Sequence, residues 1–161
     1  MDDRPEPGQA AELEPGLRRV LAPNASPMTH WGTNTYLVGQ TERALVDPGP
    51  DDPAHLAALL GAIGGARVGC ILVTHAHRDH SAGVRPLAEA TGAPVIAFGP
   101  PGAGRSAVMQ ALADAGLSGG GEGVDMGFAP DREIGDGGTV TVDGLTIEAI
   151  HTPGHFARNG T

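Results

Sequence analysis

The segment Cys70-Ile-Leu-Val-Thr-His-Ala-His-Arg-Asp-His80 joins a short apolar run to a dense group of polar residues. The run at 70–73 is continuous and too short for a helix, so it predicts a strand buried on both faces. Four side chains that can bind a metal, three histidines and one aspartate, follow within the six positions 75–80. Because ligands commonly lie at the carboxyl ends of strands in such sheets, the segment predicts a metal site at a strand end.

The spacing of the first two histidines supports this interpretation. In an extended segment the side chains of His75 and His77 point the same way, about 6.6 Å apart along the backbone. Two imidazoles at that separation can converge on one ion at about 2.0 to 2.1 Å each. Asp79 adds a hard oxygen donor, and a mixed nitrogen and oxygen site suits zinc, iron or manganese. The alternative is a solvent-facing polar loop, but this density of potential ligands favours metal binding.

Helices and strands alternate on either side of this segment. Asp51-Asp52-Pro53 predicts the start of a helix over 53–63, with a carboxylate N-cap and a proline at the first helical position. Its apolar stripe comprises Leu56, Leu59, Leu60 and Ile63. Further helices are expected over 81–90 and 105–115, and strands over 17–22, 34–39, 43–47 and 93–98. This alternation predicts βαβ units and a sheet that helices cover on one side.

The two ends of the chain follow other patterns. Residues 1–16 contain three prolines, five acidic residues and no apolar periodicity, which predicts a mobile tail ahead of a domain over 17–161. Short strands are expected over 133–134, 139–142 and 145–150. Asp136-Gly-Gly138 and Asp143-Gly144 are typical of hairpin turns between them.

Composition excludes several classes of protein. The chain has 161 residues, 19 acidic against 10 basic, a net charge of -9 and one cysteine. The lack of a basic cluster argues against a nucleic acid partner held by broad phosphate neutralisation. No apolar run approaches the roughly 18 residues of a membrane span, and the acidic start does not resemble a signal peptide. One cysteine cannot form an intramolecular disulfide. We therefore expect a cytoplasmic protein without a membrane anchor.

The remaining polar candidates are better explained without a function. His151 is expected to be packed or exposed rather than a ligand. His30 could line the mouth of a pocket, but a plain loop histidine is the simpler interpretation. Cys70 is expected to be a buried inert thiol. His55 is expected on the polar side of its helix.

Several motifs in order resemble the metallo-β-lactamase superfamily. His75-Ala-His-Arg-Asp-His80 matches that family's His-x-His-x-Asp-His signature, which is highly specific. Leu45-Val-Asp-Pro-Gly49 is similar to its upstream aspartate motif, and Thr152-Pro-Gly-His155 to its downstream histidine motif. Gly32-Thr-Asn-Thr-Tyr-Leu37 is similar to the branch that contains glyoxalase II and the lactamase-like endoribonucleases. The resemblance covers roughly residues 17–156.

The resemblance implies a metal centre with two positions. The matching ligands are His75, His77 and His155 for the first ion, and Asp79 and His80 for the second. Asp47 would orient ligands by hydrogen bonding, so Asp47 and Asp79 are the expected catalytic residues. In the family, a water or hydroxide held by the ions attacks a carbonyl or phosphoryl centre. Zinc is the expected metal, with iron or manganese as alternatives.

The resemblance also implies an α+β fold, a four-layer αβ/βα sandwich of the metallo-β-lactamase type. The chain would supply the N-terminal half and the start of the second half. It ends six residues after His155, ahead of the aspartate and histidine that complete the family's second metal site. We therefore expect a truncated C-terminal part, one tightly bound zinc ion, and possible self-association through an exposed sheet face.

The function implied is hydrolysis of a small-molecule thioester or other ester through a zinc-bound hydroxide. Two alternatives stay open: a non-catalytic or vestigial zinc-binding module, and a phosphodiester hydrolase acting on RNA. The acidic balance makes RNA the less suitable substrate. Arg78 and Arg85 could bind an anionic substrate group, although solvated arginine is the plainer interpretation for each.

Overall fold

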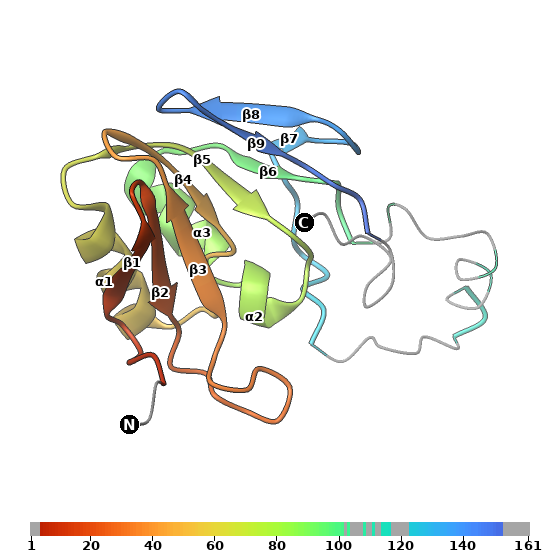
Figure 1. Cartoon of the computed structure of the whole chain (residues 1–161). Helices are drawn as coiled ribbons and strands as arrows, with labels where there is room; N and C mark the ends of the chain where they lie inside the picture. Colours follow the sequence, from red (N-terminus) through yellow and green to blue (C-terminus); the bar gives the residue numbers. More distant parts are fainter. Residues whose placement is uncertain are drawn as a thin grey trace.

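Seven strands form one mixed sheet in the order β1-β2-β3-β4-β5-β6-β7 (Figure 1). The computed structural model describes residues 4–101, 103, 108, 111, 114–116 and 123–152. The strands are β1 Ala10–Glu14, β2 Leu17–Leu21, β3 Asn34–Val38, β4 Glu42–Val46, β5 Arg67–Val73, β6 Val95–Ala97 and β7 Arg132–Glu133. The pairs from β1 to β4 are antiparallel, and those from β4 to β7 are parallel. This change of direction places the carboxyl ends of β4 and β5 at the same edge.

In the described part of the chain, helices connect β4 to β5 and β5 to β6, as is usual for a parallel crossover. They are α1 Pro53–Ile63, α2 Arg78–Ser81 and α3 Val84–Thr91. The predicted bounds of α1 are confirmed: Asp52 is its N-cap and accepts a hydrogen bond from the His55 backbone N–H at 2.7 Å. α1 and α3 cover one face of the sheet, where Leu59 and Leu87 are fully buried.

A two-stranded hairpin covers part of the opposite face (Figure 1). It consists of β8 Thr139–Val142 and β9 Leu145–Glu148. Asp143 and Gly144 join the strands with φ of 51° and 78°, the positive values that a tight hairpin turn of this kind requires. The Asp143 carboxylate accepts hydrogen bonds from Gln40 and Thr41, which tie the hairpin to the turn between β3 and β4. Val142 packs against the sheet beside Cys70 and Leu72.

Two sequence predictions require correction in the helices and at the N-terminus. Residues 10–14 are not part of a mobile tail, because they form β1 and pair with β2. The helix expected over 81–90 corresponds mainly to α3, which begins later, at Val84, because a separate short helix, α2, ends at Ser81. The helix expected over 105–115 lies mostly outside the described residues. Assignment of 17–161 to one domain stays a prediction.

The apolar stripe of α1 also differs from the prediction. Leu59 and Ile63 are buried as expected, but Leu60 is 37% exposed. His55, expected on the polar side, is 1% exposed and packs under the sheet edge that holds the metal-site motif. The reason is a polar partner inside the core, Thr35 of β3, whose hydroxyl lies 3.1 Å from His55 Nε2.

Within the part of the chain that the structure describes, none of the helices combines the length and apolar character needed to cross a bilayer.

Candidate metal centre

The metal-site motif follows β5 directly. β5 ends at Val73, Thr74 to His77 form a loop, and α2 begins at Arg78. Asp47 follows the neighbouring strand β4, and its backbone N–H donates to Leu72 O at 2.9 Å. The prediction that the histidine cluster lies at a strand end is confirmed, and the same sheet edge contributes Asp47.

Asp47 is the centre of a hydrogen-bond network. Its side chain is almost completely buried, with the whole residue 6% exposed. Oδ1 accepts from the Thr74 backbone N–H at 2.8 Å. Oδ2 accepts from the Thr74 hydroxyl at 2.7 Å and from His80 Nδ1 at 2.8 Å. A buried carboxylate is costly unless hydrogen bonds compensate it, and these three contacts do so.

This network fixes which nitrogen carries the proton in two of the histidines. His80 Nδ1 faces a carboxylate oxygen, so it donates and Nε2 is left without the proton. The Thr74 hydroxyl uses its only hydrogen on Asp47, so its oxygen accepts from His75 Nδ1 at 3.0 Å. Both rings therefore present an unprotonated Nε2 when neutral. In metal sites, carboxylates orient the binding imidazoles in the same way, by accepting a hydrogen bond from the ring nitrogen that does not bind the metal.

The histidine rings lie next to one another. The ring centroids of His75 and His77 are 4.9 Å apart, with the rings nearly perpendicular, and those of His75 and His80 are 4.2 Å apart. Burial and the neighbouring His80 lower the pKa of His75 to about 4, so His75 is neutral at pH 7. Burial also lowers the pKa of His80, but its hydrogen bond with Asp47 and the charges of Asp47 and Asp79 outweigh it, leaving that pKa raised.

A second segment of the chain holds the histidine loop from the other side. His77 forms a β-bridge with Val124. The Asp125 backbone N–H donates to Ala76 O at 2.8 Å, and the Arg78 N–H donates to Gly123 O at 2.7 Å. His77 is also the N-cap residue of α2, and its carbonyl accepts from the backbone of Ser81. The extended conformation predicted for 75–77 thus depends on a partner segment far along the chain, since Ala76 and Asp125 are 49 residues apart.

Asp79 lies in the first turn of α2, on the side of the histidines. Its Oδ2 is 3.5 Å from His80 Nε2, and its side chain is about one third exposed. This carboxylate is partly accessible from solvent and faces His80 Nε2, the nitrogen that carries no proton when the ring is neutral. It can therefore serve as a metal ligand or as a proton acceptor.

The candidate set from the sequence is brought together only in part. Asp47, His75, His77, Asp79 and His80 meet at one sheet edge. His155 lies outside the described residues. Among the residues that are described, no three or more His, Cys, Asp or Glu side chains form a complete metal-binding group. The oriented imidazoles beside a carboxylate nevertheless have the donor chemistry that zinc takes.

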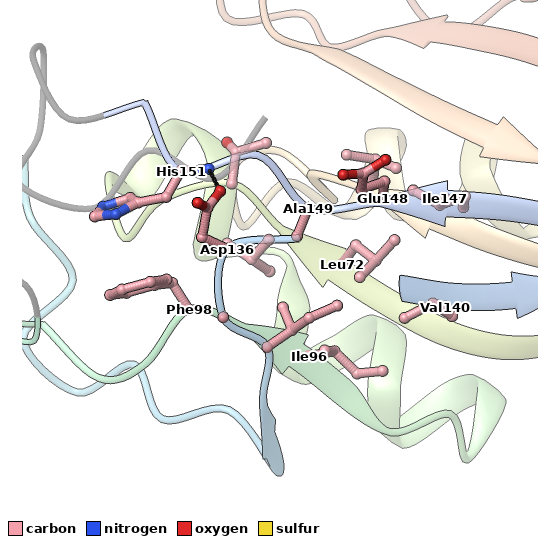
Figure 2. A pocket seen from close by; sticks show the side chains of 14 residues that line it. Leu72, Ile96, Phe98, Asp136, Val140, Ile147, Glu148, Ala149 and His151 are labelled. Atoms are coloured by element: carbon pink, nitrogen blue, oxygen red, sulfur yellow. Dashed lines mark hydrogen bonds between the residues drawn. The ribbon is translucent and has the colours of Figure 1, made fainter. Parts of the chain in front are cut away.

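His151 packs against Phe98, and that it is not a metal ligand stays a prediction. Figure 2 shows it at one end of an apolar cavity of about 80 Å³ between the sheet and the hairpin. Its ring stacks on Phe98 with centroids 4.2 Å apart, and its backbone N–H donates to Asp136 at 2.9 Å. Leu72 and Ile96 of the sheet line the same cavity.

The other minor candidates also agree with the plainer interpretation. His30 is exposed and its ring contacts Trp31. Burial raises the pKa of the Cys70 thiol, so it is a poor nucleophile at neutral pH. Arg85 pairs with Glu89 on the exposed surface of α3.

Sequence reasoning missed two polar residues that support this centre. Thr35 and His55 are both buried and hydrogen-bonded beneath the Asp47 loop. Thr35 stands inside the Gly32–Leu37 motif, which was a signal that the position matters but not of what it contacts. His55 carried no signal, because its partner lies 20 residues away in sequence.

Gly83 lies where any larger side chain would collide with the loop that follows Asp47. Its N–H donates to Gly49 O at 2.9 Å, and a Cβ placed on it would lie 2.9 Å from the carbonyl oxygens of Pro48 and Pro50. Gly83→Ala must push the loop after Asp47 away, so we expect a loss of about 1 to 3 kcal/mol in the free energy of unfolding. Urea denaturation of the metal-free protein measures this.

The matched control for this prediction is Gly61→Ala. Gly61 lies within α1, and an added Cβ meets no described atom within 4 Å. Alanine is favoured over glycine inside a helix by about 1 kcal/mol, so this variant should be as stable as the parent or more so. A Gly83→Ala protein with the stability of Gly61→Ala would contradict the packing described above.

Comparison with known proteins places this geometry in a family. The family model described as metallo-beta-lactamase superfamily matches residues 28–157. The chain is 36% identical over 142 residues to the lactamase-like protein aptB of Emericella nidulans. It is 34% identical over 147 residues to an atrochrysone carboxyl ACP thioesterase of Aspergillus chevalieri. These matches cover 86% and 89% of this chain but 38% and 40% of the relatives, so the chain spans about two fifths of their length.

Solved structures agree with the sequence relatives. A metallo-beta-lactamase from Cronobacter sakazakii, a HARLDQ motif mutant, has a TM-score of 0.67 at 26% identity, covering 94% of this chain and 57% of that one. The metallo-beta-lactamase SMB-1 bound to 2-mercaptoethanesulfonate has a TM-score of 0.69 at 25% identity, covering 98% and 59%. The predicted α+β fold of the metallo-β-lactamase type is confirmed. Membership of the glyoxalase II branch stays a prediction.

Proposed function

The chain belongs to the metallo-beta-lactamase superfamily, and from that premise we propose that it takes part in zinc-dependent hydrolysis of a thioester or related ester. Superfamily membership supports the hydrolase class. Two relatives, from Aspergillus chevalieri and Aspergillus fumigatus, are named atrochrysone carboxyl ACP thioesterases, which supports a thioester as the substrate class. The substrate would then be an acyl group joined to a thiol.

The residues proposed to hold the metal are those of the histidine cluster. His75 and His77 would bind the first ion with His155, and Asp79 and His80 would contribute to a second position. When bound, such an ion lowers the pKa of water to about 7 and polarises a carbonyl oxygen. Iron or manganese could replace zinc in a site with these donors.

The chain's own side chains prepare this site. Asp47 holds the proton on Nδ1 of His80 and, through Thr74, on Nδ1 of His75. Each neutral ring then has its free lone pair on Nε2, so no change of tautomer is needed before a metal binds. Asp79 Oδ2 is accessible and is proposed to accept a proton from the attacking water.

The single observation that carries the proposal is the Asp47 network. One buried carboxylate sets the tautomers of two adjacent histidines, at distances of 2.7 to 3.0 Å throughout. A solvated polar loop has no need of a buried carboxylate behind it. A purely structural role for Asp47 would be satisfied by Thr74 alone, without His75 and His80.

Charge around the site argues against RNA as the substrate. Arg78 of α2 and Arg85 of α3 border the same hollow. Three carboxylates also line it: Asp51, Asp125 and Asp131. Arg85 is already paired with Glu89. A phosphodiester backbone would meet at least as many negative as positive groups there, in a chain of net charge -9.

Thiol release tests the substrate class. The purified 161-residue chain is treated with a chelator, reloaded with zinc, and incubated with the acetyl thioester of N-acetylcysteamine and with bis(p-nitrophenyl) phosphate. We expect the chelator to remove thiol release and zinc to restore it, with slower phosphodiester cleavage. Faster phosphodiester cleavage would favour the nuclease alternative. Zinc-dependent folding without turnover of either substrate would favour a non-catalytic module.

A further inference from the structure

Asp47 adopts a backbone conformation that needs external support. Its φ is 54°, in the left-handed region that side chains other than glycine rarely adopt. Such residues persist only where the surroundings hold them in place, and they cluster at functional sites. The conformation turns the chain sharply at the end of β4, so that the carboxylate reaches Thr74 and His80.

A buried hydrogen-bond chain supplies that support. The Thr35 hydroxyl donates to the Asp47 carbonyl at 2.6 Å, and His55 Nε2 lies 3.1 Å from the same hydroxyl oxygen. Thr35 is 0% exposed and His55 1%. The hydroxyl has one hydrogen, which it gives to Asp47, so His55 must donate from Nε2. Donation into the hydroxyl oxygen polarises it and strengthens its own donation to the carbonyl.

The charge state of His55 agrees with donation from Nε2. Burial lowers the pKa of His55, and the opposing influence of Asp52 and of a hydrogen bond with the Pro48 backbone, which can use only the same Nε2 proton because Nδ1 has no partner in the described part of the chain, does not reverse it. The ring is therefore neutral at pH 7 and carries one proton, on Nε2. Nδ1 is buried and has no hydrogen-bond partner among the described residues, as expected of the unprotonated nitrogen in an apolar setting.

The His55 ring also packs against the loop itself. Gly49 has a φ of 82°, and a Cβ on it would lie 2.9 Å from His55 Nε2 and 3.0 Å from Cδ2. The Gly49 N–H donates to His80 O at 3.2 Å. One face of the loop thus rests on the imidazole, and its backbone reaches the helix that contains His80.

We infer that Thr35 and His55 are positioning residues for the metal centre, acting through Asp47. They hold the Asp47 peptide in its left-handed conformation, and the carboxylate then sets the orientation of His80. The effect on zinc rests on the proposed function, whereas the effect on the Asp47–His80 hydrogen bond does not. A buried pair that only satisfies its own polar atoms would affect stability but not this geometry.

Paired substitutions separate these roles. Thr35→Val keeps the shape and removes the hydroxyl, while Thr35→Ser keeps the hydroxyl. His55→Leu removes the donor, while His55→Gln returns an N–H near the position of Nε2. Thr91→Val is a matched control, because it removes a hydroxyl-to-carbonyl hydrogen bond of 2.8 Å at the far end of α3.

The first measurement is the imidazole N–H signal of His80 in NMR spectra of the metal-free protein. We expect the signal to be protected from exchange in the parent, Thr35→Ser and Thr91→Val proteins, and lost in Thr35→Val. The second is zinc affinity by competition with a chromophoric chelator, where Thr35→Val should bind on the order of tenfold more weakly than Thr35→Ser. Should Thr35→Val fail to fold, His55→Leu against His55→Gln gives the same comparison.

Each outcome bears on one claim. If the His80 signal is present in the parent and lost in Thr35→Val, but the parent binds no zinc, the proposed function is overturned and the positioning role is supported. Zinc binding and His80 signals that are alike in Thr35→Val and Thr35→Ser would overturn the positioning role and leave the proposed function intact.

Discussion

We expect His77→Ala to abolish the proposed zinc-dependent release of thiol. His77 lies at the start of α2 with its ring 4.9 Å from that of His75, so alanine removes one of the two imidazoles that the extended loop presents together. Loss of an outer hydrogen-bond partner of a metal ligand typically costs 10- to 100-fold in affinity or activity, so removing a ligand should cost at least about 100-fold. The rate of thiol release at saturating zinc measures the loss.

The matched control for this variant is His30→Ala. His30 is exposed, contacts Trp31 and belongs to a loop outside the histidine cluster. It should retain the parental rate. His77→Ala should also fold normally, because the contacts of residue 77 with Val124 and Ser81 are made by the backbone. A His77→Ala protein with parental turnover would place the chemistry elsewhere.

We expect Asp47→Ala to produce the second large effect, on stability as well as on the proposed zinc affinity. The substitution leaves the N–H and hydroxyl of Thr74 and the Nδ1–H of His80 without their acceptor. A fully buried unsatisfied donor costs about 1 to 3 kcal/mol, but these three groups are only part-buried and water can partly replace Asp47, so we expect a combined loss of about 2 to 4 kcal/mol in the free energy of unfolding. Urea denaturation of the metal-free protein measures it.

Asp47→Asn separates the two effects of this residue. Asparagine keeps the shape and one acceptor oxygen, so it should recover much of the stability. It replaces the other acceptor with a donor, so either Thr74 or His80 loses its partner, and zinc affinity should still fall by about 10-fold or more. Asp51→Asn, at an exposed neighbouring position, is the control. A zinc affinity of Asp47→Asn equal to that of the parent would contradict a role of the carboxylate in metal binding.

The elements around the site were predictable from local sequence signals. Asp52 and Pro53 specify the start of α1 whatever the tertiary context, because the cap is formed within the first turn. The apolar run at 70–73 required a buried strand, and β5 extends it toward the N-terminus to Arg67. The alternation of strands and short helices then limited the architecture to a sheet with helical cover.

The elements that were missed depend on distant partners. β1 is an edge strand with mostly exposed residues, so it has no apolar alternation to detect, and only its pairing with β2 identifies it. His55 belongs to the polar class in any helical pattern. Its burial follows from the Thr35 hydroxyl, which the sequence alone does not place beside it.

The candidate site shows the same division. The density of ligands at 75–80 and their position after a strand were readable, and the family resemblance added Asp47. The positive φ of Asp47 and the hydrogen bond from Thr74 to Asp47 could not be predicted, because both depend on how β3, β4 and β5 align at one edge of the sheet. Side-chain tautomers follow from that alignment rather than from any local pattern.

These observations connect the fold to the proposed chemistry. The sheet aligns the ends of β4 and β5, so a residue from each strand end can share one hydrogen-bond network. The buried Asp47, held in place by these strands, then orients the imidazoles through its hydrogen bonds with His80 and Thr74. Substrate preference would be added by whatever surrounds this edge, because fold and metal site alone support many reactions.

Zinc titration against a chromophoric chelator tests the central claim most directly, using the parent chain, His77→Ala and His30→Ala. We expect the parent and His30→Ala proteins to compete with the chelator for zinc, whereas His77→Ala should do so at least about 100-fold less effectively. Equal competition by all three proteins, or none by the parent, would contradict a metal centre in the loop from His75 to His80.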